Sequence, residues 1–162
     1  MNLYTSYYKS PIGSVKLECD DVYLKSVVIE DDSFLQQECE HPILMEAKNQ
    51  LDEYFTGSRK TFDLPLDQAG TNFQKKVWDL LYQLPYGKTI SYTDLTKRYG
   101  DGKAIRAVAA ANGRNKIWII IPCHRVIGSN RSLTGYAGGL WRKKWLLEHE
   151  AKHFSGVMQF QF

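Results

Sequence analysis

Cys123 and His124 are adjacent residues whose side chains could together carry out nucleophilic chemistry. A cysteine attacks as its thiolate, and a neighbouring base or cation is what generates thiolate near neutral pH. Free cysteines are also among the most buried side chains in proteins, and many act only as small hydrophobes. The pair alone therefore leaves two interpretations open, a reactive thiol and an inert buried one.

The residues before the pair predict where the thiol lies. Residues 117–121 are Ile-Trp-Ile-Ile-Ile, and such a short β-branched, apolar run is typical of a buried strand. Pro122 cannot continue the pairing, so Cys123 is expected at a strand end or tight turn, deep but reachable. Regular alternation would place Trp118 on the face opposite Cys123, packed against helices. Irregularity near Asn115 and Pro122 would instead let Trp118 narrow the pocket around the thiol.

The composition predicts a globular protein without a membrane span. The chain has 162 residues, of which 43% are hydrophobic, as in ordinary compact domains. No apolar run approaches the roughly 20 residues of a membrane span, and no signal peptide is evident. We expect a cytoplasmic protein, or a nuclear one in a nucleated cell. Three cysteines without Cys-x-x-Cys spacing argue against a disulfide framework or a structural zinc site, and we expect neither metal nor cofactor.

Charge is unevenly distributed along the chain. The formal net charge is only +3, and acidic clusters are concentrated in the first 70 residues. The segment 75–131 carries eleven lysines and arginines against three aspartates and no glutamate. A basic half joined to an acidic half suggests that the basic half faces nucleic acid.

The first part of the chain predicts strands followed by a helix. Alternation of apolar and polar residues over 3–29, interrupted by turn signals, predicts three antiparallel strands joined by short hairpins. Apolar positions at three-to-four spacing over 42–55 predict an amphipathic helix that ends near Gly57. We therefore divide the chain into an N-terminal α/β lobe, a linker and a C-terminal lobe, at 1–62, 63–70 and 71–162.

The second lobe predicts a helix-turn-helix. Thr71, with Gln74 three residues later, is a capping-box signature for its first helix. Segments 91–99 and 104–113 then predict two short helices around a glycine-containing break. The second of these is rich in alanine, with Arg106 as its main long side chain on the first turns. Alanine suits a helix packed closely on a neighbour, but a slim helix could also enter a DNA groove while the arginine inserts, and the sequence leaves both interpretations open.

These motifs together resemble a known family, the O6-alkylguanine-DNA alkyltransferases (methylated-DNA–protein-cysteine methyltransferases). The resemblance covers about residues 70–150, half of the chain, with its spacing intact. It rests on Arg106-Ala107-Val108, Asn115, Pro122-Cys123-His124-Arg125-Val126-Ile127, Gly135-Tyr136-Ala137-Gly138-Gly139 and Leu146-Leu147-Glu148-His149-Glu150. It implies an α+β fold: a small N-terminal α/β lobe with an antiparallel, ribonuclease-H-like sheet, and a mainly helical C-terminal lobe with a winged helix-turn-helix.

The resemblance also implies an activity, DNA repair by direct reversal of damage. The protein would flip an O6-alkylguanine, or an O4-alkylthymine, out of the duplex and transfer the alkyl group irreversibly to Cys123. His124 would deprotonate Cys123 through a water, and Glu150 would hold His124 in the right tautomer. This is the logic of a catalytic triad applied to a thiol. Asn115 would brace the turn that joins the recognition helix to the active-site segment.

The family's recognition of DNA implies further contacts. The partner would be double-stranded DNA, bound through its minor groove by a monomer. Tyr92 would rotate the target phosphate and hydrogen-bond the guanine, and Arg106 would replace the extruded base in the stack. The expected substrate or DNA contacts are Tyr92, Arg106, Arg125, Val126, Tyr136 and Ala137.

The implied base pocket is formed largely by backbone groups. Tyr136 would form its wall, and the backbone near Ala137 would donate to the guanine oxygen. The carbonyls of Cys123 and Val126 would accept the exocyclic amine, which makes the pocket selective for guanine over adenine.

Departures from the family pattern concern pocket width. Lys116 follows Asn115 where relatives commonly have proline, and Trp118 is bulky where smaller residues are usual. Two other functions stay open: a non-catalytic lesion binder, in which tryptophan usually replaces the cysteine, and a thiol hydrolase with turnover. The presence of Cys123 argues against the first, and the stoichiometry of transfer would separate the second.

Overall fold

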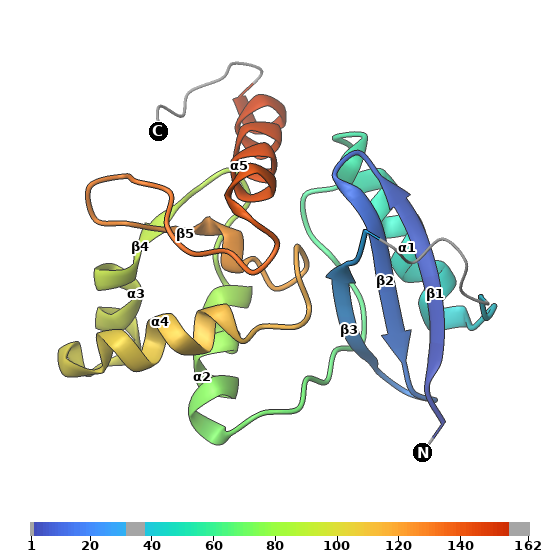
Figure 1. Ribbon diagram of the computed structural model, residues 1–162, viewed down its shortest axis with the longest axis horizontal. Coiled ribbons are helices and arrows are strands. Elements are labelled where there is room, and N and C mark those ends of the chain that lie inside the picture. The colour runs from blue at the N-terminus through green and yellow to red at the C-terminus, as the bar shows by residue number, and fades with distance from the viewer. Residues whose placement is uncertain (1, 32–37, 156–162) are drawn as a thin grey trace. The chain divides into compact units, whose positions relative to one another are not determined.

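The computed structural model describes residues 2–31 and 38–155. The chain forms two compact units, Met1–Ala69 and Gly70–Phe162 (Figure 1). Helices and strands occur in both, in the α+β class expected from the sequence. Within the described ranges, no helix is long and apolar enough to cross a membrane.

The first unit is a three-stranded sheet with one helix packed on it. Its strands pair antiparallel in the order β1-β2-β3, and the helix α1 contacts β1 and β2 (Figure 1). On β2 every second side chain (Val15, Leu17 and Cys19) is fully buried, as the alternation of a half-buried strand requires. The expected hairpins and helix are confirmed, with bounds β1 Tyr4–Ser10, β2 Gly13–Cys19, β3 Leu24–Ile29 and α1 Pro42–Phe55.

The segment expected to be a linker, 63–70, is instead largely part of the first unit. The amide of Leu24 donates to the carbonyl of Pro65, and the amide of Asp67 donates to the carbonyl of Leu24. Leu66 thereby pairs in parallel with the start of β3. Backbone pairing of this kind extends the first unit to Ala69, beyond the expected boundary at residue 62.

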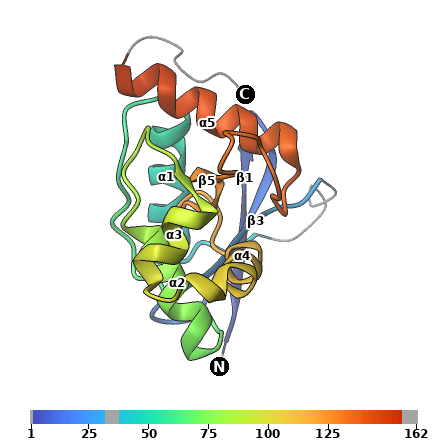
Figure 2. The ribbon, with the colours of Figure 1, turned by 90° about the vertical axis from the view of Figure 1, so that its left-hand side faces the viewer.

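The second unit begins with three short helices that contact one another: α2 Asn72–Tyr82, α3 Tyr92–Tyr99 and α4 Ile105–Gly113. The capping box predicted at Thr71 and Gln74 is present, with both reciprocal hydrogen bonds formed. Figure 2 shows α4 nearly end-on beside α2 and α3. The indole nitrogen of Trp78 on α2 donates to the carbonyl of Ala111 at 2.8 Å, so small residues let α4 approach α2 closely.

The break between α3 and α4 forms the predicted helix-turn-helix. Gly100 ends α3 with a φ of 104°, in the left-handed region that glycine adopts without a steric penalty. Asp101 then accepts a hydrogen bond from the amide of Lys103 and begins a short 3-10 turn, Gly102–Ala104. The chain leaves this turn directly into α4, whose Arg106 is exposed.

The expected strand at 117–121 is wrong, because this segment is a buried turn. Ile119 has a φ of 72°, and the amide of Ile121 donates back to the carbonyl of Ile117. The apolar run is explained by burial: Ile117 and Ile119 are at most 1% exposed. Short apolar runs identify buried backbone without specifying a strand.

The rest of the second unit consists of two very short strands, a 3-10 turn and a long helix. Strand β4, Ile90–Ser91, pairs in parallel with β5, Val126–Ile127. The 3-10 turn Cys123–Arg125 leads directly into β5, so the parallel pair fixes the backbone immediately after the turn that carries the candidate nucleophile. The long helix α5 spans Leu140–Ser155.

Candidate active site

Cys123 is the first residue of the 3-10 turn and is 4% exposed. Its amide donates to the carbonyl of Ile121 at 2.8 Å, which fixes the backbone beneath the thiol. Burial raises the pKa of this thiol to about 11, although Asn115 and Lys143 act to lower it. A resting thiol in this environment is protonated at neutral pH, so reaction requires a base that removes its proton.

His124 and Glu150 form a buried pair beside the cysteine. The Nε2 atom of His124 lies 2.7 Å from Oε2 of Glu150, and both side chains are at most 1% exposed. Burial lowers the pKa of His124 and Glu150 raises it, with a net shift downward. The imidazole is therefore neutral, and a hydrogen bond from Nε2 to the carboxylate leaves the lone pair on Nδ1. Among the described residues, Nδ1 has no hydrogen-bond partner.

Arg125 does not lie where a substrate or DNA contact was expected. Its guanidinium is buried, donates from Nε and Nη2 to Glu150 at 2.8 and 3.1 Å, and donates from Nη1 to the carbonyl of Leu84 at 2.6 Å. Burial alone would raise the pKa of Glu150, but His124 and Arg125 hold it well below its usual range. Arg125 thus helps to keep Glu150 ionised, and the burial of its guanidinium argues against the DNA contact predicted from the sequence.

Asn115 braces the buried turn that leads to the cysteine, at the position expected for it. Its side-chain nitrogen donates to the carbonyls of Ile117 and Ile121 at 3.3 and 2.9 Å. Its side-chain oxygen accepts from the amide of Ile117 at 3.1 Å. One carboxamide therefore closes both ends of the turn 117–121, and it also acts to lower the pKa of Cys123.

A small cavity of about 10 Å³ lies over the thiol and is lined by Cys123, Trp118, Asn112, Gly113, Asn115, Gly135, Tyr136 and Ala137. Its volume is close to that needed for one water molecule. Trp118 and Cys123 line the same cavity, so the prediction that strand alternation places them on opposite faces is wrong. The backbone turn at Ile119 places the indole on the side of the thiol. The indole nitrogen donates to the carbonyl of Asn115 at 2.9 Å, and its ring centroid lies 5.6 Å from that of Tyr136.

The loop over the cavity packs tightly. A Cβ atom added at Gly138 would lie 2.7 Å from the ring of Tyr136 and 3.1 Å from that of Trp118. Glycine at this position lets the loop lie directly on the two aromatic rings. Tyr136 and Ala137 therefore line the cavity as expected, whereas Val126 is fully buried in β5.

Lys143 is a buried cation that the sequence analysis missed. Its Nζ donates to the carbonyls of Val126, Thr134 and Gly135 at 2.6, 2.7 and 3.2 Å, and burial lowers its pKa to about 8. It ties the loop before Tyr136 to β5. The sequence did contain a signal for this burial: Lys143 shares one helical face with Leu146, Leu147 and Glu150, at the spacing i, i+3, i+4 and i+7.

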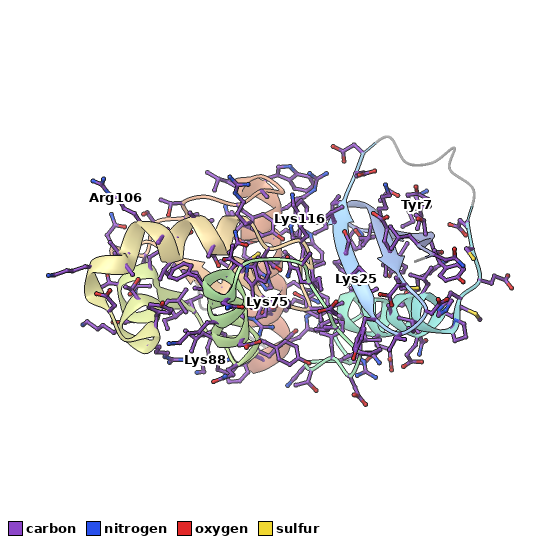
Figure 3. The ribbon with its side chains drawn as sticks, turned by 90° about the horizontal axis from the view of Figure 1, so that it is seen from below. Tyr7, Lys25, Lys75, Lys88, Arg106 and Lys116 are labelled. Carbon is purple, nitrogen blue, oxygen red and sulfur yellow. The ribbon has the colours of Figure 1, made fainter. Side chains whose placement is uncertain are left out.

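Tyr92 and Arg106, two of the residues expected to act on DNA, lie at the N-terminal ends of α3 and α4. Tyr92, the first residue of α3, donates from its hydroxyl to the carbonyl of Thr134 at 3.2 Å, near the cavity loop. Arg106 is exposed at the start of α4 and extends away from the helix (Figure 3). The structure thus gathers Cys123, His124 and Glu150 into one buried site and leaves Arg106 on the surface.

The parts of the chain that the structure describes contain no group of three or more His, Cys, Asp or Glu side chains that could hold a metal ion.

Comparison with known proteins matches both units of the chain. Residues 3–68 match the family model described as 6-O-methylguanine DNA methyltransferase, ribonuclease-like domain, and residues 72–152 match the DNA binding domain of the same family. The chain belongs to the 6-O-methylguanine DNA methyltransferase family.

Individual relatives cover nearly the whole chain. It is 46% identical to the constitutive methylated-DNA–protein-cysteine methyltransferase of Bacillus subtilis over 85% of this chain and 88% of the relative. Identity to the Methanosarcina acetivorans protein of the same name is 45%, over 91% and 98%. The structure of Mycobacterium tuberculosis OGT in complex with DNA aligns with a TM-score of 0.83 at 41% identity, covering 94% of each chain. The fold and family expected from the sequence are confirmed.

Proposed function

We propose that this protein repairs DNA by direct reversal, transferring the alkyl group of O6-alkylguanine in DNA to its own Cys123. The observation that carries this proposal is a cysteine facing a small cavity, followed immediately by a histidine whose Nε2 is held by a buried carboxylate. Methylated-DNA–protein-cysteine methyltransferases at about 45% identity over most of the chain support the same reaction.

The chemistry begins with removal of the thiol proton. The proton of Cys123 passes through a water to Nδ1 of His124, and Glu150 stabilises the resulting imidazolium. The sulfur attacks the alkyl carbon, a carbon–sulfur bond forms, and the bond from that carbon to O6 breaks. The electron pair leaves with O6, and the resulting guanine anion takes up one proton at N1 to regain its unmodified form, which balances the proton that left Cys123. The carbon–sulfur bond of the resulting thioether is not readily broken again, because the cysteine thiolate is a poor leaving group, so each protein molecule reacts once.

Docking on DNA is assigned to the helix-turn-helix. DNA binding itself is supported by the DNA binding domain match and by the Mycobacterium tuberculosis complex. We assign α4 to the minor groove, Arg106 to the gap left by the extruded base, and Tyr92 to the target phosphate and guanine edge. The protein acts as a monomer, in the cytoplasm or in the nucleus of a nucleated cell. A second substrate of the same reaction is O4-alkylthymine.

Mass spectrometry after mixing with duplex DNA that contains O6-methylguanine tests the proposal. We expect a single gain of about 14 Da, the mass of one added CH2 group, as thiol alkylation requires. Peptide mapping should place it on Cys123 and not on Cys19 or Cys39. Cys39→Ser is the matched control and should still react, because Cys39 lies in the first unit.

The Cys123→Ser variant should bind the same DNA without gaining mass, since the thiol does the chemistry and the helices do the docking. Methyl transfer to that variant would remove Cys123 from its role. Release of more than one product molecule per protein would indicate a hydrolase with turnover instead.

A further inference from the structure

Asn112, in the last turn of α4, has a buried amide oxygen without a partner. The residue is 4% exposed and lines the cavity over Cys123. Within the described ranges, its Oδ1 atom has no hydrogen-bond partner. A buried acceptor left unsatisfied is costly, and such groups in native proteins are usually completed by a water or a ligand. An acceptor on the wall of a reaction cavity is suited to a donor on the substrate.

The other end of the same amide is directed at Tyr92. Burial raises the pKa of Tyr92, whereas its hydrogen bonds with Thr134 and Asn112 act to lower it. An amide lowers the pKa of a phenol when its NH2 group donates to the phenol oxygen. The NH2 group of Asn112 thus faces Tyr92, and the oxygen is the end left for the cavity. This orientation distinguishes the two ends of a carboxamide, which are otherwise nearly equivalent in shape.

The donors on the substrate base are few. Alkylation at O6 leaves N1 of guanine without a proton, so the exocyclic 2-amino group is the base's only N–H donor. O4-alkylthymine has no N–H donor on its ring. One of the two backbone carbonyls expected to accept the amine, that of Val126, already accepts from Lys143 at 2.6 Å. A further acceptor on the cavity wall would complete recognition of a group that carries two protons.

We propose that Oδ1 of Asn112 accepts a hydrogen bond from the 2-amino group of the extruded base and makes the pocket prefer O6-alkylguanine over alkylated bases without that group. The inference rests on the proposed function, because it requires the base to enter the cavity over Cys123. It assigns to Asn112 a part in specificity, separate from the proton transfer by His124 and Glu150.

Two matched substrates test the role of Asn112: duplexes that contain O6-methylguanine, and the same duplexes with O6-methylhypoxanthine, which lacks only the 2-amino group. The rate of methyl transfer is measured for the native protein, for Asn112→Leu and for Asn112→Asp. In Asn112→Leu, which is similar in size, the rate on O6-methylguanine should fall about ten-fold, equivalent to about 1.4 kcal/mol. The rate on O6-methylhypoxanthine should fall much less, because the variant then loses only the hydrogen bond between Asn112 and Tyr92, which is lost with both substrates, and none to the base.

Asn112→Asp keeps an acceptor at the same place and is the control. The negative charge of the aspartate should lower the rate of methyl transfer from both substrates, because it disfavours formation of the Cys123 thiolate. The preference for O6-methylguanine over O6-methylhypoxanthine should be retained. Comparing ratios between variants cancels the cost of extruding each base. Asn112→Ala provides the same ratio if the leucine variant does not fold.

Equal losses on both substrates in Asn112→Leu would overturn the assignment and show that Asn112 acts through Tyr92 or through packing. Native rates on both substrates in Asn112→Leu would overturn it as well. In both cases the native protein still methylates itself, so the proposed function survives. A native protein that gains no methyl group would remove both proposals.

Discussion

Replacing Arg125 with methionine tests whether this arginine supports the active site or contacts DNA. The guanidinium makes two hydrogen bonds to Glu150 and one to the carbonyl of Leu84, and its side chain is only 6% exposed. Breaking a buried charge pair by removing one partner typically costs about 3–5 kcal/mol. Glu150 keeps its hydrogen bond with His124, so we expect about 3 kcal/mol, measured as the loss in free energy of unfolding in urea.

The same variant should leave DNA affinity and its salt dependence unchanged. A buried guanidinium neutralises no phosphate, whereas an exposed one releases a counterion on binding. Arg106→Ala is the matched control, because it removes an exposed arginine and should cost little stability while weakening DNA binding. The assay is DNA affinity measured over a series of salt concentrations.

Two results would refute this reasoning about Arg125. One is a decrease of about 1 in the slope of log affinity against log salt for Arg125→Met, which is the change expected on losing a phosphate contact. The other is a free energy of unfolding equal to that of the native protein. The first result would show that Arg125 contacts a phosphate, and the second would show that its ion pair with Glu150 does not stabilise the fold.

Three further predictions follow from the site. Arg106→Ala should slow repair of duplex DNA on the order of ten-fold more than reaction with free O6-methylguanine, because only the duplex requires unstacking; equal losses in the two rate assays would contradict this. Trp118→Ala should raise the ratio of benzyl to methyl transfer rates, since the indole lines the cavity with Cys123; an unchanged ratio would make Trp118 a packing residue. Because burial lowers the pKa of His124 below 6.5, the unfolded chain takes up a proton that the folded chain does not, so the free energy of unfolding should fall as the pH drops below about 6.5, by at most about 1.4 kcal/mol per pH unit. Urea titrations across this range should show a steeper fall for the native protein than for His124→Asn.

The elements that depend on local signals were predicted well from the sequence. The capping box at Thr71 and the glycine break near Gly100 act through hydrogen bonds and backbone angles within a few residues, so the residue types alone specify them. The alternation of β2 likewise reports one buried face. The pairing of Cys123 with His124 could be predicted for the same reason, because the two residues are adjacent in the sequence.

The segment 117–121 shows why other features could not be predicted. Its apolar residues report burial, and both a strand and a buried turn satisfy that requirement. What selects the turn is the carboxamide of Asn115, which bonds the carbonyls of Ile117 and Ile121. The outcome decides on which side of the backbone Trp118 lies, and therefore the width of the pocket.

Arg125 and Lys143 show a second limit, which concerns charge. Both add to the basic character of the second unit in the sequence, yet both are at most 5% exposed and satisfy acceptors inside the protein. Arg125 holds the carboxylate that orients His124, and Lys143 holds the loop that carries Tyr136. A count of basic residues therefore overstates the surface available to DNA. Arg106, by contrast, is exposed, and its replacement should weaken DNA binding without loosening the active site.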